Sequence, residues 1–180
     1  MNYSKLMAWF IIIIMALSVL GYVGGSFFSK EEQLLDYNGY KLYHINNQWT
    51  ITLNSIKYSF QYSPLELEEL EFPTSFDIKS ISKVYLGYNS NDTFKVENYI
   101  NVLARVIYNQ GKIIQQACTT EEGCPNIPII DCVNNIGIII VSGEENNYTL
   151  EGKCLRITAV DEVELLKLTE RTIYSLLGVM

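Results

Sequence analysis

The longest run of apolar residues lies near the beginning of the chain. No charge interrupts the sequence LMAWFIIIIMALSVLGYV from Leu6 to Val23. Because a helix rises about 1.5 Å per residue, about 20 such residues cross a hydrocarbon core about 30 Å thick. The run therefore predicts a transmembrane helix, which we place at residues 6–25. Cleavage as a signal peptide at the small residues Val23-Gly24-Gly25 is the alternative.

Charges on the two sides of this run predict its orientation. Lys5 and the N-terminal amine precede the run, whereas Lys30 on the far side is followed at once by two glutamates. Basic flanking residues stay in the cytoplasm, so we expect residues 1–5 inside the cell and the remainder outside. This predicts a single-pass protein of the cell membrane with an extracellular C-terminal domain.

Further along, apolar and polar residues alternate with a period of two, which is typical of strands. The alternation covers three stretches separated by asparagine-containing turns: Tyr40–Ile45, Trp49–Leu53 and Ile56–Tyr62. They predict an antiparallel meander with aromatic residues gathered on one face. We expect this face to pack in the core. A groove for a carbohydrate or a peptide, lined by Tyr43, Trp49 or Tyr58, is the alternative.

Two later stretches follow the 3.6-residue period of a helix. The first has its N-cap at Asn91 or Asp92 and ends at Gly111, and the second covers residues 160–177. A short helix is also expected at Ser63-Pro64-Leu65-Glu66, which has the form of a capping box. Six further strands are predicted at residues 83–88, 112–118, 127–133, 136–141, 148–150 and 154–159.

Together these elements predict one α+β domain of two layers at residues 38–180, after a polar linker at residues 26–37. The two layers are strands and helices: an antiparallel meander plus a mixed sheet, covered by two helices. The runs at residues 127–133 and 136–141 are strongly apolar and β-branched, so we expect them to be central strands.

The four cysteines, Cys118, Cys124, Cys132 and Cys154, are an even number. Outside the cytoplasm an even set predicts two disulfides, which four cysteines form in one of three pairings. A zinc site usually brings paired Cys-x-x-Cys motifs, and this chain has none, so disulfides are favoured over a metal. Among the pairings we favour Cys118–Cys124, which closes a small loop, and Cys132–Cys154, which joins one strand to another.

The charge balance narrows the range of partners. The chain has 20 Asp and Glu residues against 13 Lys and Arg residues, a formal net charge of −7, and every acidic residue follows Lys30. Nucleic acid is not an expected partner, because phosphate binding needs a basic surface. Two sequons for N-glycosylation, which begin at Asn91 and Asn147, fit an extracellular domain.

Few residues have catalytic potential. The one histidine, His44, lies in a predicted strand with no motif around it. Asp131 lies in an apolar run beside Cys132, and we expect it to point outward or to cap the neighbouring loop. The acidic run Glu66–Glu71 has no calcium-loop pattern, so we expect a solvated face. No metal, cofactor or enzymatic activity is expected; hydrolysis by paired carboxylates is the alternative.

Three segments of the second half carry a resemblance: CTTEEGCPNIPIIDC from Cys118, EGKCLRITA from Glu151 and LTERTIYSLLGVM from Leu168. Together with the apolar N-terminal segment, the Asn-Gly strand opening and the Trp-bearing second strand, they resemble a family of uncharacterised archaeal proteins that are exported and membrane-anchored. The resemblance implies an archaeal cell envelope and brings no activity, substrate or catalytic residue with it.

These features lead us to expect a structural or interaction module of the cell envelope or of a membrane protein assembly. Its expected partners are the membrane, through one N-terminal helix, and another envelope or membrane protein. An ectodomain that binds a glycan, a peptide or a cation is the alternative.

Overall fold

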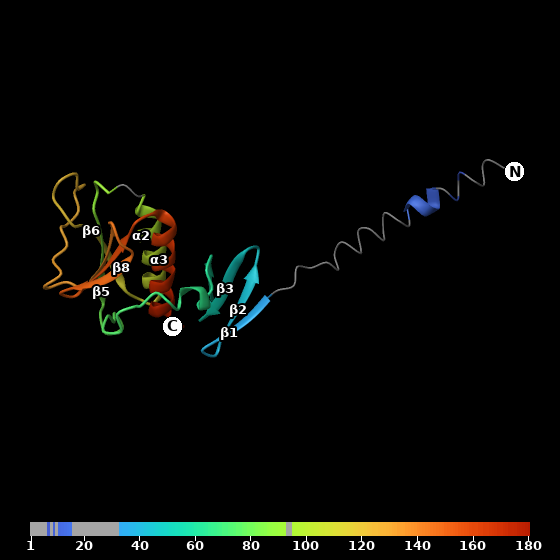
Figure 1. Cartoon of the computed structure of the whole chain (residues 1–180), viewed down its shortest axis with the longest axis horizontal. Coiled ribbons are helices and arrows are strands. Elements are labelled where there is room, and N and C mark those ends of the chain that lie inside the picture. The colour runs from blue at the N-terminus through green and yellow to red at the C-terminus, as the bar shows by residue number, and fades with distance from the viewer. Residues whose placement is uncertain (1–6, 8, 10, 16–32, 93–94) are drawn as a thin grey trace.

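The computed structural model describes residues 7, 9, 11–15, 33–92 and 95–180 (Figure 1). The predicted tail at residues 1–5, most of the predicted anchor at residues 6–25 and the linker up to residue 32 lie outside the described residues. Residues 11–15 are helical. Within the described ranges, no helix combines the length and the apolar character needed to span a membrane.

Four antiparallel strands form the first sheet, in their order along the chain: β1 (Gln33–Tyr37), β2 (Tyr40–Ile45), β3 (Gln48–Leu53) and β4 (Ile56–Phe60) (Figure 1). The predicted meander is confirmed in β2, β3 and β4. The first strand differs from expectation, because the sequence assigns residues 33–37 to the linker. The meander therefore begins at Gln33 and has four strands.

Each hairpin of the meander turns through two residues with positive φ. Asn38 and Gly39 have φ values of 51° and 81°, and Asn46-Asn47 and Asn54-Ser55 follow the same pattern. Such two-residue turns match the right-handed twist of the strands, and asparagine and glycine adopt them most easily. The Asn38-Gly39 pair is therefore the signal in the sequence that identifies β1 as a strand.

Five strands form the second sheet, in the order β6-β5-β7-β9-β8. Their bounds are β5 (Lys83–Tyr88), β6 (Ile113–Cys118), β7 (Gly137–Ser142), β8 (Asn147–Glu151) and β9 (Cys154–Ala159). All neighbours are parallel except the edge strand β8, which is antiparallel to β9, so the mixed sheet is confirmed. The predicted central strand at residues 127–133 is wrong: there, Ile129 makes an isolated bridge to Cys118.

Two helices, α2 (Glu97–Asn109) and α3 (Glu162–Leu177), pack together on one face of the second sheet (Figure 1). The α2 helix begins later than predicted, with Val96 as its N-cap. Asp92 accepts a hydrogen bond from the Ser142 N–H, at 2.7 Å, and so holds the end of β7. The α3 helix begins as expected for a capped helix, because the Asp161 carboxylate accepts from the Glu164 N–H at 2.8 Å.

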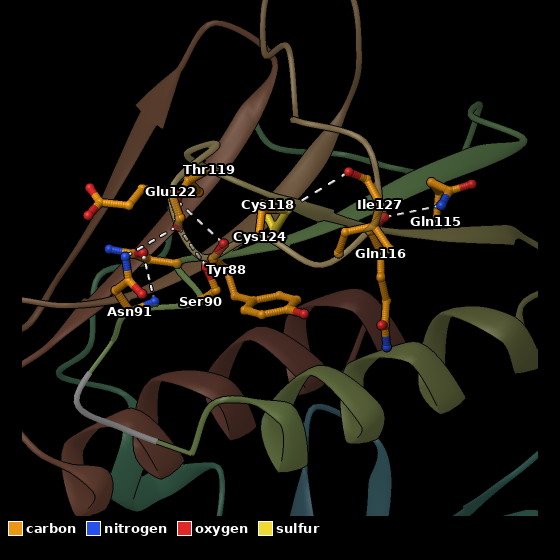
Figure 2. Close-up of a disulfide and its surroundings, with 11 residues drawn as sticks. Tyr88, Ser90, Asn91, Gln115, Gln116, Cys118, Thr119, Glu122, Cys124 and Ile127 are labelled. Atoms are coloured by element: carbon orange, nitrogen blue, oxygen red, sulfur yellow. Dashed lines mark hydrogen bonds between the residues drawn. A yellow bond between two sulfur atoms is a disulfide. The ribbon is translucent and has the colours of Figure 1, made fainter.

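Both disulfides have the pairing that the sequence favours. Cys118 and Cys124 are joined with an S–S distance of 2.05 Å and close a small loop at the end of β6 (Figure 2). Cys132 and Cys154 are joined at 2.07 Å, which ties the loop after β6 to the start of β9.

The loop between the two bridges covers the face of the sheet opposite the helices. In β7, Ile138 and Ile140 belong to the main core with the helices, so Gly137 and Ile139 face the other way. A Cβ atom on Gly137 would lie 2.6 Å from the Ile130 Cδ1 atom and 2.8 Å from the Tyr85 carbonyl oxygen. Ile130 thus packs closely on the sheet, whereas Ile129 and Val133 of the same segment are 40% and 73% exposed.

The meander packs its inner face against α3. Phe60 stacks on Tyr174 with ring centroids 4.0 Å apart, and the Tyr174 hydroxyl donates to the Tyr62 carbonyl at 3.0 Å. At the other end of the interface, the Asn38 side chain donates to the Val179 carbonyl at 3.1 Å. Tyr58 and Phe60 are buried, which confirms the aromatic face as core.

A groove lined jointly by Tyr43, Trp49 and Tyr58 does not form. Tyr43 pairs with Thr50 and is 39% exposed on the outer face of the meander. Trp49 lies in the next register position, paired with His44, and faces inward with Tyr58 because side chains alternate along a strand. These three side chains therefore do not line one groove together, and a ligand-binding role of the domain stays a prediction.

The predicted short helix after Ser63 is reduced to a single 3₁₀ turn, η1 (Leu65–Leu67). Its capping box is present. The Ser63 hydroxyl and N–H donate to the Glu66 carboxylate at 2.6 and 2.7 Å, and the Glu66 N–H donates to the Ser63 hydroxyl at 3.3 Å. The turn places the Glu66 carboxylate near the junction of the meander and α3.

Candidate functional site

A groove of about 380 Å³ lies where the end of the meander meets the two helices. The end of the β3–β4 pair forms one wall, with Gln48, Ser59 and Gln61. The N-terminal half of α2 contributes Tyr99 and Val102 to the helical side. This volume is within the range of ordinary ligand sites, so the groove is the candidate functional site of the domain.

The α3 helix contributes one long row of residues to the same groove. They recur at the spacing of a single helix face: Glu162, Leu166, Thr169, Glu170 and Ile173. The groove thus combines an apolar floor with carboxylate, amide and hydroxyl groups. Recognition sites commonly have this composition, in which apolar walls bind and a few polar groups orient the ligand.

Glu170 is the buried acid of this site. The residue is only 6% exposed. The two oxygens of its carboxylate accept hydrogen bonds from the Gln61 N–H at 2.8 Å and the Tyr62 N–H at 2.9 Å. Burial raises the pKa of Glu170 to about 7; the two N–H donors lower it and the nearby Glu66 carboxylate raises it. Glu170 therefore binds the chain just beyond β4 and changes charge near neutral pH.

Thr169 places an unpartnered hydroxyl in the wall of the groove. The residue is 1% exposed, and its Oγ1 atom has no hydrogen-bond partner in the described part of the chain. In a helix such a hydroxyl usually donates to the carbonyl four residues earlier, as the Thr172 hydroxyl does to the Leu168 carbonyl at 2.8 Å. A buried polar group without a partner is costly, so Thr169 marks a point where a ligand group or a water is stabilised.

The groove contains four titratable side chains. Its titratable side chains are Glu162, Glu170, Lys95 and Tyr99, and the Tyr99 hydroxyl donates to the Glu162 carbonyl at 3.1 Å. Both oxygens of Glu170 already accept backbone hydrogen bonds, so this carboxylate is a positioning group. The lining residues include no cysteine, a common nucleophile, and no histidine, the usual base that activates one.

The other residues with predicted roles lie away from the groove. Asp131 is exposed in the disulfide-linked loop and accepts from the Val133 N–H at 2.9 Å and the Asn134 side chain at 2.6 Å. The bond from Asn134 contributes most to holding the pKa of Asp131 below its ordinary value. Asp131 thus points outward and caps a turn, as expected. His44 packs on Trp49 with ring centroids 4.9 Å apart.

The acidic run Glu66–Glu71 does not gather into a metal site. No group of three His, Cys, Asp or Glu side chains suited to a metal ion occurs among the residues that the structure describes. Glu66 is engaged in the capping box, and Glu68 and Glu69 are exposed.

The two sequon asparagines lie in different settings. Asn91 is exposed beside the Cys118–Cys124 loop, where its side chain donates to the Glu122 carbonyl at 3.2 Å (Figure 2). Thr93 of this sequon lies outside the described residues. Asn147 opens β8, and its side-chain oxygen is buried without a hydrogen-bond partner in the described part of the molecule.

One feature of the sequence that helical periodicity alone does not capture points to the groove. On α3, Val163 is 55% exposed, whereas the face that packs includes Leu165, Thr169 and Tyr174. Glu170 lies three and four residues before Ile173 and Tyr174, on their side of the helix. A carboxylate on the apolar face of a helix is the feature that points to a buried acid.

Comparison with protein-family models, with curated proteins and with solved structures finds no match to this chain. The groove and its residues therefore carry the functional argument on their own chemistry.

Proposed function

We propose that this chain is a single-pass, membrane-anchored extracytoplasmic module that binds another component of the cell envelope. The observation that carries the binding role is the groove between the meander and the helices, with the buried Glu170 and the unpartnered Thr169 hydroxyl in its wall. Exposed apolar residues at its rim, such as Val102 at 43% exposure, suit a protein partner.

The two disulfides support the proposed compartment. Disulfides persist in oxidising surroundings and are rare in the cytoplasm, where thiols are kept reduced. A domain with both bridges formed, Cys118–Cys124 and Cys132–Cys154, suits the outside of a cell. The apolar run at residues 6–25 and the archaeal resemblance support attachment to an archaeal membrane on that side.

Site-directed cross-linking in cells tests the binding role. A photoreactive amino acid replaces Val102 at the groove, and in a matched variant replaces Val133, which is 73% exposed in the disulfide-linked loop. We expect the full-length chain to form a defined adduct from position 102 and none of that mass from position 133. Equal adducts from both positions, or none from either, would refute a partner at the groove.

Extraction and mass measurement test the anchor and the compartment. We expect the full-length chain to stay with membranes in alkaline carbonate and to gain mass on reduction and alkylation, as four thiols become accessible. Release into the carbonate supernatant would contradict the anchor. Cysteines that react before reduction would contradict an oxidising compartment.

A further inference from the structure

We infer that the groove binds an extended peptide segment of the partner, which adds as a strand to the free edge of β4. This inference rests on the proposed binding role and names the ligand class. In strand addition, the backbone of the ligand pairs with an exposed sheet edge, and side-chain pockets beside that edge select the sequence.

The register of the meander identifies the free backbone groups of β4. Its turn at Asn54-Ser55 has two residues, so the flanking pair Leu53–Ile56 is a hydrogen-bonded pair, and every second residue after Ile56 also bonds to β3. Lys57 and Ser59 therefore direct their N–H and C=O groups away from β3. Among the strands that the structure describes, β4 has no neighbour on that side.

Ser59 places this edge in the groove. It lines the groove and is exposed, so its outward N–H and C=O are within reach of a ligand. The next outward N–H along the strand direction, that of Gln61, already donates to the Glu170 carboxylate. The Glu170 carboxylate thus accepts the hydrogen bond from Gln61 that the backbone of an added strand would otherwise accept, so an added strand would stop beyond Ser59.

This arrangement defines where an added strand would lie. It would pair with Lys57 and Ser59 and end at Glu170, with alternate side chains directed into the groove. The groove there is lined by Leu166 and Ile173, with Val102 at its rim, and these residues suit an apolar side chain. Among the described strands, β1, β6 and β8 are also at sheet edges, although Cys118 at the end of β6 already pairs with Ile129. At β4 the edge and this groove come together.

The charged residues of the groove favour a peptide that carries a basic group. Of the groove-lining residues, Glu162 and Glu170 are acidic and Lys95 is basic. A basic group next to the apolar residue of the peptide would be attracted by these two carboxylates, of which Glu162 is the exposed one. We therefore expect a preferred sequence with one apolar residue beside a lysine, an arginine or a free N-terminus.

Peptide selection on the full-length chain tests the inference. The chain is purified in detergent, immobilised, and screened with a library of random seven-residue peptides. Recovered peptides are then measured on Ser59→Pro, in which the outward N–H is absent while the bonds to β3 remain. The matched controls are Ser59→Ala, which keeps the N–H, and Leu150→Pro, which removes an outward N–H on the distant edge β8.

We expect the dissociation constant to rise about tenfold or more in Ser59→Pro and to stay within about twofold in both controls. Amide hydrogen exchange at Ser59 should slow when the peptide binds. Methylation of alternate peptide nitrogens should abolish binding in the set that faces β4 and spare the other set. Unchanged far-UV circular dichroism and intact disulfides verify that each variant is folded.

Three results would overturn the inference. One is a library that yields no peptide whose binding depends on Ser59. Another is equal loss from both sets of methylated peptides. The third is preferred binding of a synthetic peptide with the sequence of residues 26–32, since the occupant would then be the chain itself. None of these results alters the cross-linking at position 102, so strand addition can fail while the proposed binding role stands.

Discussion

Replacing Glu170 by glutamine should remove most of the pH dependence of stability that this site creates. In the folded chain the pKa of Glu170 is about 7, because its burial outweighs two backbone hydrogen bonds, whereas the ordinary value is 4.5. A carboxyl group with a raised folded-state pKa binds its proton more tightly when folded. Its contribution to stability is therefore greatest below pH 4.5 and is lost as the pH rises through 7.

The magnitude follows from the two pKa values. Between pH 5 and pH 8 the Glu170 carboxyl is mostly ionised in the unfolded chain. In the folded chain it loses its proton only within this interval, and the ionised form is less stable there because it is buried. The resulting loss in the free energy of unfolding is about 2 kcal/mol over this interval. For a domain of this size it corresponds to a fall of about 4–8 °C in the melting temperature.

Urea unfolding of the full-length chain at pH 5 and pH 8, followed by tryptophan fluorescence, measures this loss. The Glu170→Gln variant should lose about 2 kcal/mol less than the unmodified chain over the same interval. Glu69→Gln, a change at an exposed carboxylate of the neighbouring turn, is the control and should keep the original loss. Equal pH dependence in the unmodified chain and in Glu170→Gln would refute the reasoning.

Three further changes probe the packing of the domain, each measured by chemical unfolding. Replacing Cys132 and Cys154 together by alanine should lower the free energy of unfolding by about 3 kcal/mol, since the bridge closes a loop of sequence separation 22; no change would contradict this role. Gly137→Ala should cost about 2 kcal/mol, and adding Ile130→Ala should recover part of it; full stability in the single variant would contradict the close contact. Tyr174→Phe removes the hydrogen bond to the meander and should cost about 1 kcal/mol; stability equal to the unmodified chain would show that this bond contributes nothing.

Local patterns in the sequence predict the parts of the fold that are stabilised locally. The hairpins of the meander depend on alternation and on two-residue turns, both of which are visible within a few residues. The disulfide pairing is also predicted correctly, although the stretch around Cys132 is a loop and not the strand that the pattern indicates. The strand β1 could have been predicted in the same way, because the Asn38-Gly39 turn follows it directly.

Long-range contacts decide the parts that the sequence does not predict. Residues 127–133 have the apolar composition of a central strand, yet in the structure they form a loop in which Ile130 packs against Gly137. Pro128, which cannot donate a ladder hydrogen bond, is a local signal against a central strand there. Asp92 has the form of a helix cap, yet its carboxylate binds the Ser142 N–H 50 residues away in sequence. The groove depends on the same kind of contact, because Glu170 and Gln61 are separated by 109 residues.

The docking of the meander on α3 has a consequence for the order of events during synthesis. The meander is the first part of the domain to be made, and α3 is the last. At ordinary rates of translation, the 108 residues between Tyr62 and Glu170 take about 5–20 s to appear, whereas hairpins form in microseconds. The nascent meander therefore exposes Trp49, Tyr58 and Phe60 for seconds. A chain that terminates before α3 keeps this aromatic surface exposed permanently and is prone to aggregate.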